Sequence, residues 1–302
     1  MDLLTRSDFD GLACAVLLRD IGLIGRWKFV HPKDLQDGNV RVTAFDILAN
    51  VPYVAGCGMW FDHHTSEWER IGKPEGFVGS LRKLDSAARV IYEYFKDRYD
   101  LSKFDTMLNE VDKVDSGRLT AEDVLNPQGW VLLGFLSDPR TGLGRFRNFR
   151  ISNYQLMEEL IEYCRTLPIE QILEKPDVKE RISLYKEQTE LFKAMLKKHT
   201  TIKDNIIITD LRGVDSIHAG NRFLIYSLYP EQNISMWIVD GKNKENCSIA
   251  VGYSVLNRTA TVDVGSVLLG YGGGGHTQVG TCQIPYDEVD KVIEELKVKL
   301  QQ

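Results

Sequence analysis

The stretch DLLTRSDFDGLACAVLLRDI, residues 2–21, sets the structural class of this protein. Its apolar start, Asp2–Thr5, predicts a short strand, and the helical spacing of apolar residues over 12–21 predicts a helix. The turn between them carries the acids Asp8 and Asp10. A strand that leads into a helix through a polar turn is the first half of a βαβ unit, which predicts a mainly parallel sheet.

Alternating strand and helix patterns continue through the first 150 residues. Ser86 is the predicted N-cap of a helix that reaches Tyr94, because small polar residues are preferred at that position. Further strands are predicted at residues 27–30, 40–46 and 59–62. We therefore expect an α/β domain over residues 1–150, with flanking helices on the sheet.

The rest of the chain predicts a helical linker and a smaller α/β domain. Residues 151–200 are rich in Glu, Lys and Leu, and breaks near Pro168 and Pro176 predict two or three helices. Residues 201–302 form the second predicted domain, and we expect an active-site cleft between the two domains. Its strands are predicted at 206–210, 223–226, 234–239 and 247–251, with a final helix over 286–300.

Composition excludes several classes of protein. The chain has 302 residues, 43% hydrophobic and 26% charged, and its net charge of −6 does not favour a long nucleic-acid-binding surface. No apolar run is long enough for a membrane span, and the N-terminus lacks the pattern of a secretory signal. The five cysteines form no C-x-x-C pair, as is typical of free thiols in a reducing compartment. We expect a cytoplasmic protein with no membrane partner.

Acidic side chains follow three of the predicted strands. Asp62 ends the strand at 59–62 and is followed by two histidines. Ligands of open α/β sheets bind beyond the carboxyl ends of the strands, so we expect these side chains to meet. Carboxylates with imidazoles suit Mn²⁺, Mg²⁺ or Fe²⁺ and do not indicate structural zinc. Each motif alone also has an ordinary explanation, since Asp and Gly favour turns. The side chains concerned are Asp8, Asp10, Asp46, His63 and His64.

These motifs resemble those of a known family. The stretches SDFDG (7–11), FD (45–46) and DHH (62–64) are similar to the first three motifs of the DHH phosphoesterase superfamily, which takes its name from the last of them. YGGGGH (271–276) resembles the glycine-rich motif of the DHH-associated C-terminal domain. The resemblance covers almost the whole chain. It is greatest to small two-domain members, which include oligoribonucleases with pAp phosphatase activity, cyclic-dinucleotide phosphodiesterases and exopolyphosphatase-related proteins.

The resemblance implies a role for each acid and histidine. Asp8 would bind a first metal ion and Asp10 a second, with Asp46 bridging the two. His63 would also bind the second ion, while His64 would lie near the substrate phosphate. Two such ions activate a water and clamp a phosphoryl group.

The fourth motif of the family is an acid that follows a helix. Asp115, in DSGR (115–118), fits the family pattern best, and we expect it to be a metal ligand. Asp112 lies three residues earlier on the same helix face and stays an alternative. A solvated side chain is the favoured interpretation of Asp112.

The first motif departs from the family at Arg6, where a histidine is usual two residues before the first acid. Arginine stays protonated and offers no lone pair to a metal, so the first ion loses a ligand. Three outcomes are open: a weakly bound first ion, Arg6 as a fixed cation on the phosphoryl oxygens, or a protein that binds its ligand without cleaving it. An Arg6 that only pairs with a neighbouring carboxylate is also compatible with the sequence.

The glycine run predicts a substrate-binding loop, because glycines let backbone N–H groups approach an anion closely. This domain lacks an arginine that related domains place shortly after a serine, here Ser248, and the nearest replacements are Arg222 and Arg258. Arg140 or Arg145 is a further candidate for the lining of the cleft. The predicted substrate-binding residues are Gly272, Gly273, Gly274, Gly275 and His276.

Together these motifs predict a metal-dependent phosphoesterase, a hydrolase that uses one or two ions of Mn²⁺ or Mg²⁺. The substrate is expected to be small and phosphorylated: a short oligonucleotide, a cyclic dinucleotide, a nucleoside bisphosphate or polyphosphate. The alternative is a catalytically weak phospholigand-binding or regulatory protein of the same family. A homodimer is possible.

Overall fold

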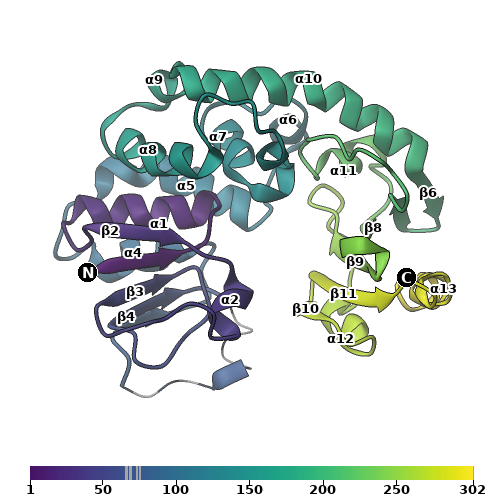
Figure 1. Ribbon diagram of the computed structural model, residues 1–302, viewed down its shortest axis with the longest axis horizontal. Coiled ribbons are helices and arrows are strands. Elements are labelled where there is room, and N and C mark those ends of the chain that lie inside the picture. The colour runs from purple at the N-terminus through teal and green to yellow at the C-terminus, as the bar shows by residue number, and fades with distance from the viewer. Residues whose placement is uncertain (65–66, 68–69, 73, 75, 302) are drawn as a thin grey trace. The chain divides into compact units, whose positions relative to one another are not determined.

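The computed structural model describes residues 1–302 except 65, 66, 68, 69, 73, 75 and 302 (Figure 1). The chain forms two compact units. The first consists of Met1–Arg118 and Pro127–Tyr185, and the second of Leu119–Asn126 and Lys186–Gln302. None of the described helices is long and apolar enough to cross a membrane. All five cysteines are free thiols, as expected. The domain boundaries expected at residues 150 and 200 stay predictions.

The first unit is built on a parallel sheet with the strand order β2-β1-β3-β4-β5 (Figure 1). The strands are β1 (Asp2–Thr5), β2 (Arg26–Phe29), β3 (Asp46–Ala49), β4 (Met59–Asp62) and β5 (Gly79–Leu81). Phe61 packs on one face against Tyr94 of helix α4 (Ala87–Phe95). Leu4 and Trp60 lie on the other face, in an apolar cluster with Leu35 of helix α2 (Pro32–Gln36). Both faces are covered, so the central strands β1, β3 and β4 are nearly continuous apolar runs, whereas the edge strand β2 keeps exposed charged residues.

Further helices of the first unit surround α1 (Phe9–Asp20), which is buried over most of its length. They are α5 (Asp105–Asp115), α7 (Gly129–Ser137) and α8 (Asn153–Thr166). The unit also contains α9 (Ile169–Leu173) and the 3-10 turns η1 (Ser102–Phe104), η2 (Pro139–Thr141) and η3 (Leu143–Arg145). The long helix α10 (Pro176–His199) begins in the first unit and continues into the second. Helix α1 contacts α4, α5, α7 and α8, so apolar residues all around the helix are needed. The breaks expected near Pro168 and Pro176 are confirmed.

The second unit is built on a mixed sheet with the order β10-β11-β9-β8-β7-β6 (Figure 1). The strands are β6 (Thr200–Lys203), β7 (Ile206–Asp210), β8 (Ile234–Asp240), β9 (Asn246–Tyr253), β10 (Gly274–His276) and β11 (Val279–Pro285). The helices are α6 (Ala121–Leu125), α11 (Leu224–Leu228), α12 (Val264–Leu269) and α13 (Val289–Lys299), with the 3-10 turn η4 (Lys242–Lys244). Strands β7 and β8 are parallel, and the other neighbours are antiparallel. Alternate residues such as Ile234, Met236 and Ile238 form the core with α12 and α13.

The predicted α/β class is confirmed, but two predicted strands are wrong. Residues 223–226 lead into helix α11, because a short apolar run does not distinguish a strand from a buried helix. Residues 40–45 form no strand, since Val40 and Val42 reach the apolar cluster of the sheet from an irregular segment. Strand β3 therefore begins at Asp46, the residue at which it was expected to end.

Candidate active site

Asp10 is a buried carboxylate held by the backbone of another helix. It lies in the first turn of α1, and its Oδ1 and Oδ2 accept the Ala88 and Ala87 N–H groups at 2.8 and 2.9 Å. These are the first N–H groups of α4, where the helix dipole favours negative charge. Burial, followed by the carboxylates of Asp115 and Asp8, raises the pKa of Asp10 well above its usual range. A cation beside Asp10 would therefore be favoured.

His63 and Asp115 face Asp10. The Nδ1 of His63 lies 3.2 Å from the carbonyl oxygen of Leu84, which can only accept, so Nδ1 carries the proton. The Nε2 of His63 lies 3.7 Å from Asp10 Oδ2 and 3.2 Å from Asp115 Oδ2. This ring nitrogen is buried, and none of the described residues forms a hydrogen bond with it. A lone pair aimed between two carboxylates indicates that a proton or a metal ion belongs there.

The donor set of Asp10, His63 and Asp115 fits a divalent ion. One ligand atom from each residue lies within 4.8 Å of the other two. Two carboxylate oxygens and one imidazole nitrogen, with room for water, suit Mn²⁺ or Mg²⁺. The contact of His63 Nδ1 with a backbone carbonyl is the outer contact that usually orients a metal-binding histidine.

Asp62 orients His64. The Asp62 side chain is buried at the end of β4, and its Oδ1 accepts the His63 N–H at 2.9 Å and the His64 Nδ1–H at 2.8 Å. Burial lowers the pKa of His64, but the hydrogen bond and charge of Asp62, with Asp115 and Asp10, raise it to about 9. His64 is therefore a cation at neutral pH, placed next to the candidate metal ligands.

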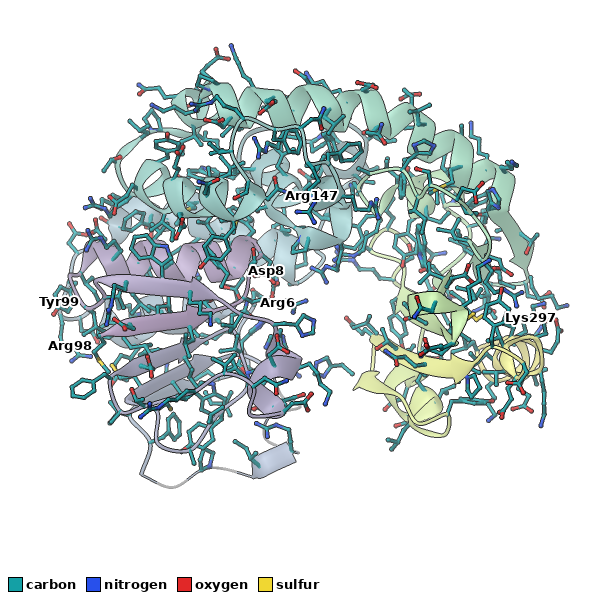
Figure 2. The ribbon with its side chains drawn as sticks, viewed as in Figure 1. Arg6, Asp8, Arg98, Tyr99, Arg147 and Lys297 are labelled. Carbon is teal, nitrogen blue, oxygen red and sulfur yellow. The ribbon has the colours of Figure 1, made fainter. Side chains whose placement is uncertain are left out.

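Asp8 is surrounded by donors. It caps α1, and its Oδ1 accepts the Gly11 N–H at 2.9 Å and the Asn50 amide N–H at 3.0 Å. Its Oδ2 pairs with Arg6 Nε at 3.1 Å. Figure 2 labels Arg6 and Asp8, which lie together where β1 leads into α1. Burial lowers the pKa of Arg140, in the same unit, but the charges of Asp138, Asp8 and Asp115 outweigh burial and raise it.

The structure does not bring Asp46 to this group, which corrects the sequence-based expectation. Asp46 starts β3 and pairs with Asp2, at the opposite end of β1 from Thr5 and the acidic turn. Its carboxylate instead accepts hydrogen bonds from the Thr43 N–H and hydroxyl, both at 2.7 Å. The residue at the carboxyl end of β3 is Asn50, which sequence reasoning missed. Its signal was the apolar run 47–49 that precedes it.

Asp115, and not Asp112, faces His63. The sequence analysis favoured a solvated Asp112, but the side chain is buried. Its Oδ1 accepts a hydrogen bond from the Ser86 hydroxyl at 2.7 Å. Its Oδ2 accepts Arg89 Nε at 2.8 Å. Asp112 therefore has a structural role beside the site.

The glycine run lies in the second unit and is partly a strand, because Gly274 and Gly275 belong to β10. A Cβ on Gly275 would lie 2.2 Å from the Val279 carbonyl oxygen, and one on Gly273 would lie 2.3 Å from that of Thr281. These two glycines are required for backbone packing against β11. A Cβ on Gly274 would meet no atom within 4 Å, so this position has open space. The role of Gly272–His276 in binding stays a prediction.

The chain is similar to several proteins of known structure. It is 44% identical to a pGpG-specific phosphodiesterase, PggH from Vibrio cholerae, over 99% of this chain and 98% of that one, with a TM-score of 0.82. RecJ of Thermus thermophilus in complex with Mn²⁺ is 12% identical over 98% of this chain and 51% of that one, with a TM-score of 0.52. CDC45 of Entamoeba histolytica is 9% identical over 99% and 95%, with a TM-score of 0.50. The last two share the fold alone. No protein-family model and no curated protein matches the sequence.

Proposed function

We propose that this chain, which belongs to the DHH phosphoesterase superfamily, hydrolyses the linear dinucleotide pGpG. The chain is a phosphoesterase, and its substrate is small and phosphorylated. The specificity of the similar Vibrio cholerae enzyme supports pGpG among the short oligonucleotides, cyclic dinucleotides, bisphosphates and polyphosphate expected from the sequence. In this reaction a water oxygen bonds to phosphorus, one P–O ester bond breaks, and the leaving oxygen takes a proton.

The metal dependence rests on one observation, the buried Nε2 of His63, which lies between Asp10 and Asp115 and has no hydrogen-bond partner in the described part of the chain. We assign these three side chains as ligands of Mn²⁺ or Mg²⁺. When bound, such an ion lowers the pKa of a water and withdraws charge from a phosphoryl oxygen. Asp46 has no part in this assignment.

The other site residues bind and orient the substrate. His64, fixed by Asp62, presents a cationic ring that can donate a hydrogen bond to the phosphate. Arg6 supplies a second positive charge beside Asp8. We assign residues 1–150 to the DHH phosphoesterase domain, 151–200 to a linker and 201–302 to a substrate-binding domain. In that last domain the glycine run Gly272–Gly275 and His276 bind the nucleotide.

The test is hydrolysis of a substrate panel by the purified full chain in Mn²⁺. The panel contains pGpG, cyclic di-GMP, pAp, a longer oligoribonucleotide and polyphosphate. We expect GMP from pGpG at a kcat/KM at least about tenfold above that for any other substrate. Asp115→Asn should abolish turnover, and Asp100→Asn, an exposed control, should not. Binding of pGpG without product in any metal would favour the regulatory alternative, and faster cleavage of another substrate would overturn the specificity.

A further inference from the structure

We propose that the Arg6–Asp8–Asn50 cluster is a phosphoryl-binding site with a fixed positive charge, and that the enzyme works with one metal ion per chain. The inference rests on the proposed phosphoesterase function but not on pGpG as its substrate. It concerns the place where the family resemblance implied a first ion bound to Asp8. Three steps lead to it: the contacts of Asp8, the ligand groups of the site, and the exposure of Arg6.

The first step is that donors already occupy most of the hydrogen-bonding positions of the Asp8 carboxylate. A carboxylate oxygen accepts about two hydrogen bonds, and the Oδ1 of Asp8 has two, from Gly11 and Asn50. Its Oδ2 is paired with the guanidinium of Arg6. Asn50 is buried, and its backbone is left-handed with a φ of 56°, a conformation that asparagine adopts more readily than most residues. The fold thus uses a restricted backbone conformation to aim an amide N–H at Asp8.

The second step is that Asp8 belongs to no group of three candidate metal ligands among the described residues. Within the described residues, the groups of three candidate ligand side chains are Asp10–His63–Asp115 and Asp62–His63–His64, and Asp8 belongs to neither. The second of these groups is held together by hydrogen bonds from two nitrogens to Asp62 Oδ1. The groups that contact the Asp8 carboxylate directly are a cation and N–H donors, which repel a divalent ion, whereas the carboxylates of Asp10 and Asp115 act on Asp8 only through their charge. The donor chemistry therefore fits one ion, at His63.

The third step is that Arg6 can reach a ligand. Its side chain is 35% exposed, and Asp8 is its one recorded ion-pair partner within the described residues. The pairing atom is Nε, so the outer edge of the guanidinium is available to two phosphoryl oxygens. Arginine binds such oxygens through paired, charge-assisted hydrogen bonds. Asp8 and Asn50 are positioning residues, which hold the cation in place before substrate arrives.

This arrangement divides the work of hydrolysis. A metal ion can lower the pKa of a water and withdraw charge from oxygen, whereas a guanidinium supplies charge alone. An ion held by Asp10, His63 and Asp115 would supply water activation, and Arg6 would stabilise the charge that grows on the phosphoryl oxygens. The charge of Arg6 is permanent, so its contribution does not depend on metal availability.

The first test counts bound ions by native mass spectrometry of the full chain saturated with Mn²⁺. We expect one ion per chain in the wild type and in Arg98→His, a control at the far end of the first unit in Figure 2. The double variant Arg6→His with Asn50→Asp replaces a cation and a donor by two ligands, and it should gain a second ion. Two tightly bound ions in the wild type would overturn the proposal whichever substrate it cleaves.

The second test measures inorganic phosphate binding by calorimetry in the presence of EDTA. Arg6→Ala should weaken phosphate binding at least about tenfold, and Arg6→Lys, which keeps the charge, should weaken it less. Thermal unfolding checks that both variants fold. Unchanged phosphate affinity in folded Arg6→Ala would overturn the proposal. Failure of pGpG hydrolysis, with one ion and Arg6-dependent phosphate binding retained, would instead overturn the proposed substrate alone.

Discussion

Asp112 accepts the Ser86 hydroxyl at 2.7 Å, and Ser86 in turn caps the helix whose first N–H groups hold Asp10. The start of α4 therefore connects Asp112 to Asp10, a buried acid that we propose as a metal ligand. Asp112 also accepts a hydrogen bond from the Nε of Arg89, which lies in the first turn of the same helix. The start of α4 is held from both its hydroxyl cap and its first turn.

Asp112→Ala should destabilise the protein by about 2 kcal/mol and weaken Mn²⁺ binding. Loss of one partner of a fully buried ion pair costs about 3–5 kcal/mol, and Arg89 keeps some access to water, so the expected cost is lower. Urea unfolding measures the first effect and calorimetry the second. Asp100→Ala, which removes an exposed turn contact, should leave Mn²⁺ affinity unchanged. If Asp112→Ala bound Mn²⁺ as tightly as the wild type, the prediction that Asp112 supports metal binding through Asp10 would be wrong.

His63→Ala should lower Mn²⁺ affinity by about 100-fold or more. This exceeds the roughly 10- to 100-fold loss typical for residues that only support a ligand, because His63 would supply a ligand atom itself. The control is His31→Ala, since His31 caps α2 by accepting the Lys33 N–H and is no candidate ligand. Calorimetric titration with Mn²⁺ decides the result. A His63→Ala protein that binds Mn²⁺ as the wild type does would refute the ligand assignment.

Asp46→Ala should retain Mn²⁺ binding and phosphoesterase turnover. Asp46 lies at the amino end of β3, where its contacts are with Thr43. Loss of these contacts should cost about 1 kcal/mol of stability. Asp115→Ala is the contrasting variant, and it should lose both metal and turnover. A folded Asp46→Ala protein that had lost activity would show that Asp46 takes part in the active site.

Gly275→Ala and Gly274→Ala should differ sharply in stability. A Cβ added at Gly275 would meet the Val279 carbonyl oxygen at 2.2 Å, whereas the space beside Gly274 is open. We expect a loss of about 2 kcal/mol or more for Gly275→Ala, as for other overpacked positions, and little change for Gly274→Ala. Thermal unfolding measures both. The bulkier Gly274→Val should keep metal binding and raise the KM for substrate; an unchanged KM would remove this glycine from the binding residues.

Much of the fold could be predicted, because the pattern of apolar residues is set by burial. Strand β4 and the Ser86 cap were predicted at the right residues, since a buried strand and a helix start each have a local signal. Residues 40–42 alternate like a strand because they reach an apolar cluster from a loop. Periodicity alone does not reveal whether such residues also form ladder hydrogen bonds.

The site was predictable where its residues follow strands that were placed correctly. His63 follows β4 and Asp10 follows β1, and both reach the acidic cluster. Asp46 was predicted at the carboxyl end of β3 but lies at its amino end. Asn50, which follows β3, was therefore not recognised as a site residue. The apolar run 47–49 marks the strand that precedes Asn50, but the contact of its amide with Asp8, 42 residues away, has no local signal in the sequence. The sequence likewise does not show that Asp112 pairs with Ser86, which leaves Asp115 as the acid that faces His63.

The two N–H groups that hold Asp10 belong to the main chain of Ala87 and Ala88, so their identity as donors does not depend on the side chains at those positions. Ordinary substitutions at 87 and 88 leave both donors in place, and only proline deletes one. The limit on these positions is volume, because both side chains are fully buried against α1 and its neighbours. Substitution of Ala87 or Ala88 by another small residue other than proline should therefore keep both hydrogen bonds to Asp10. The position of the Asp10 carboxylate thus depends on the path of the main chain at the start of α4.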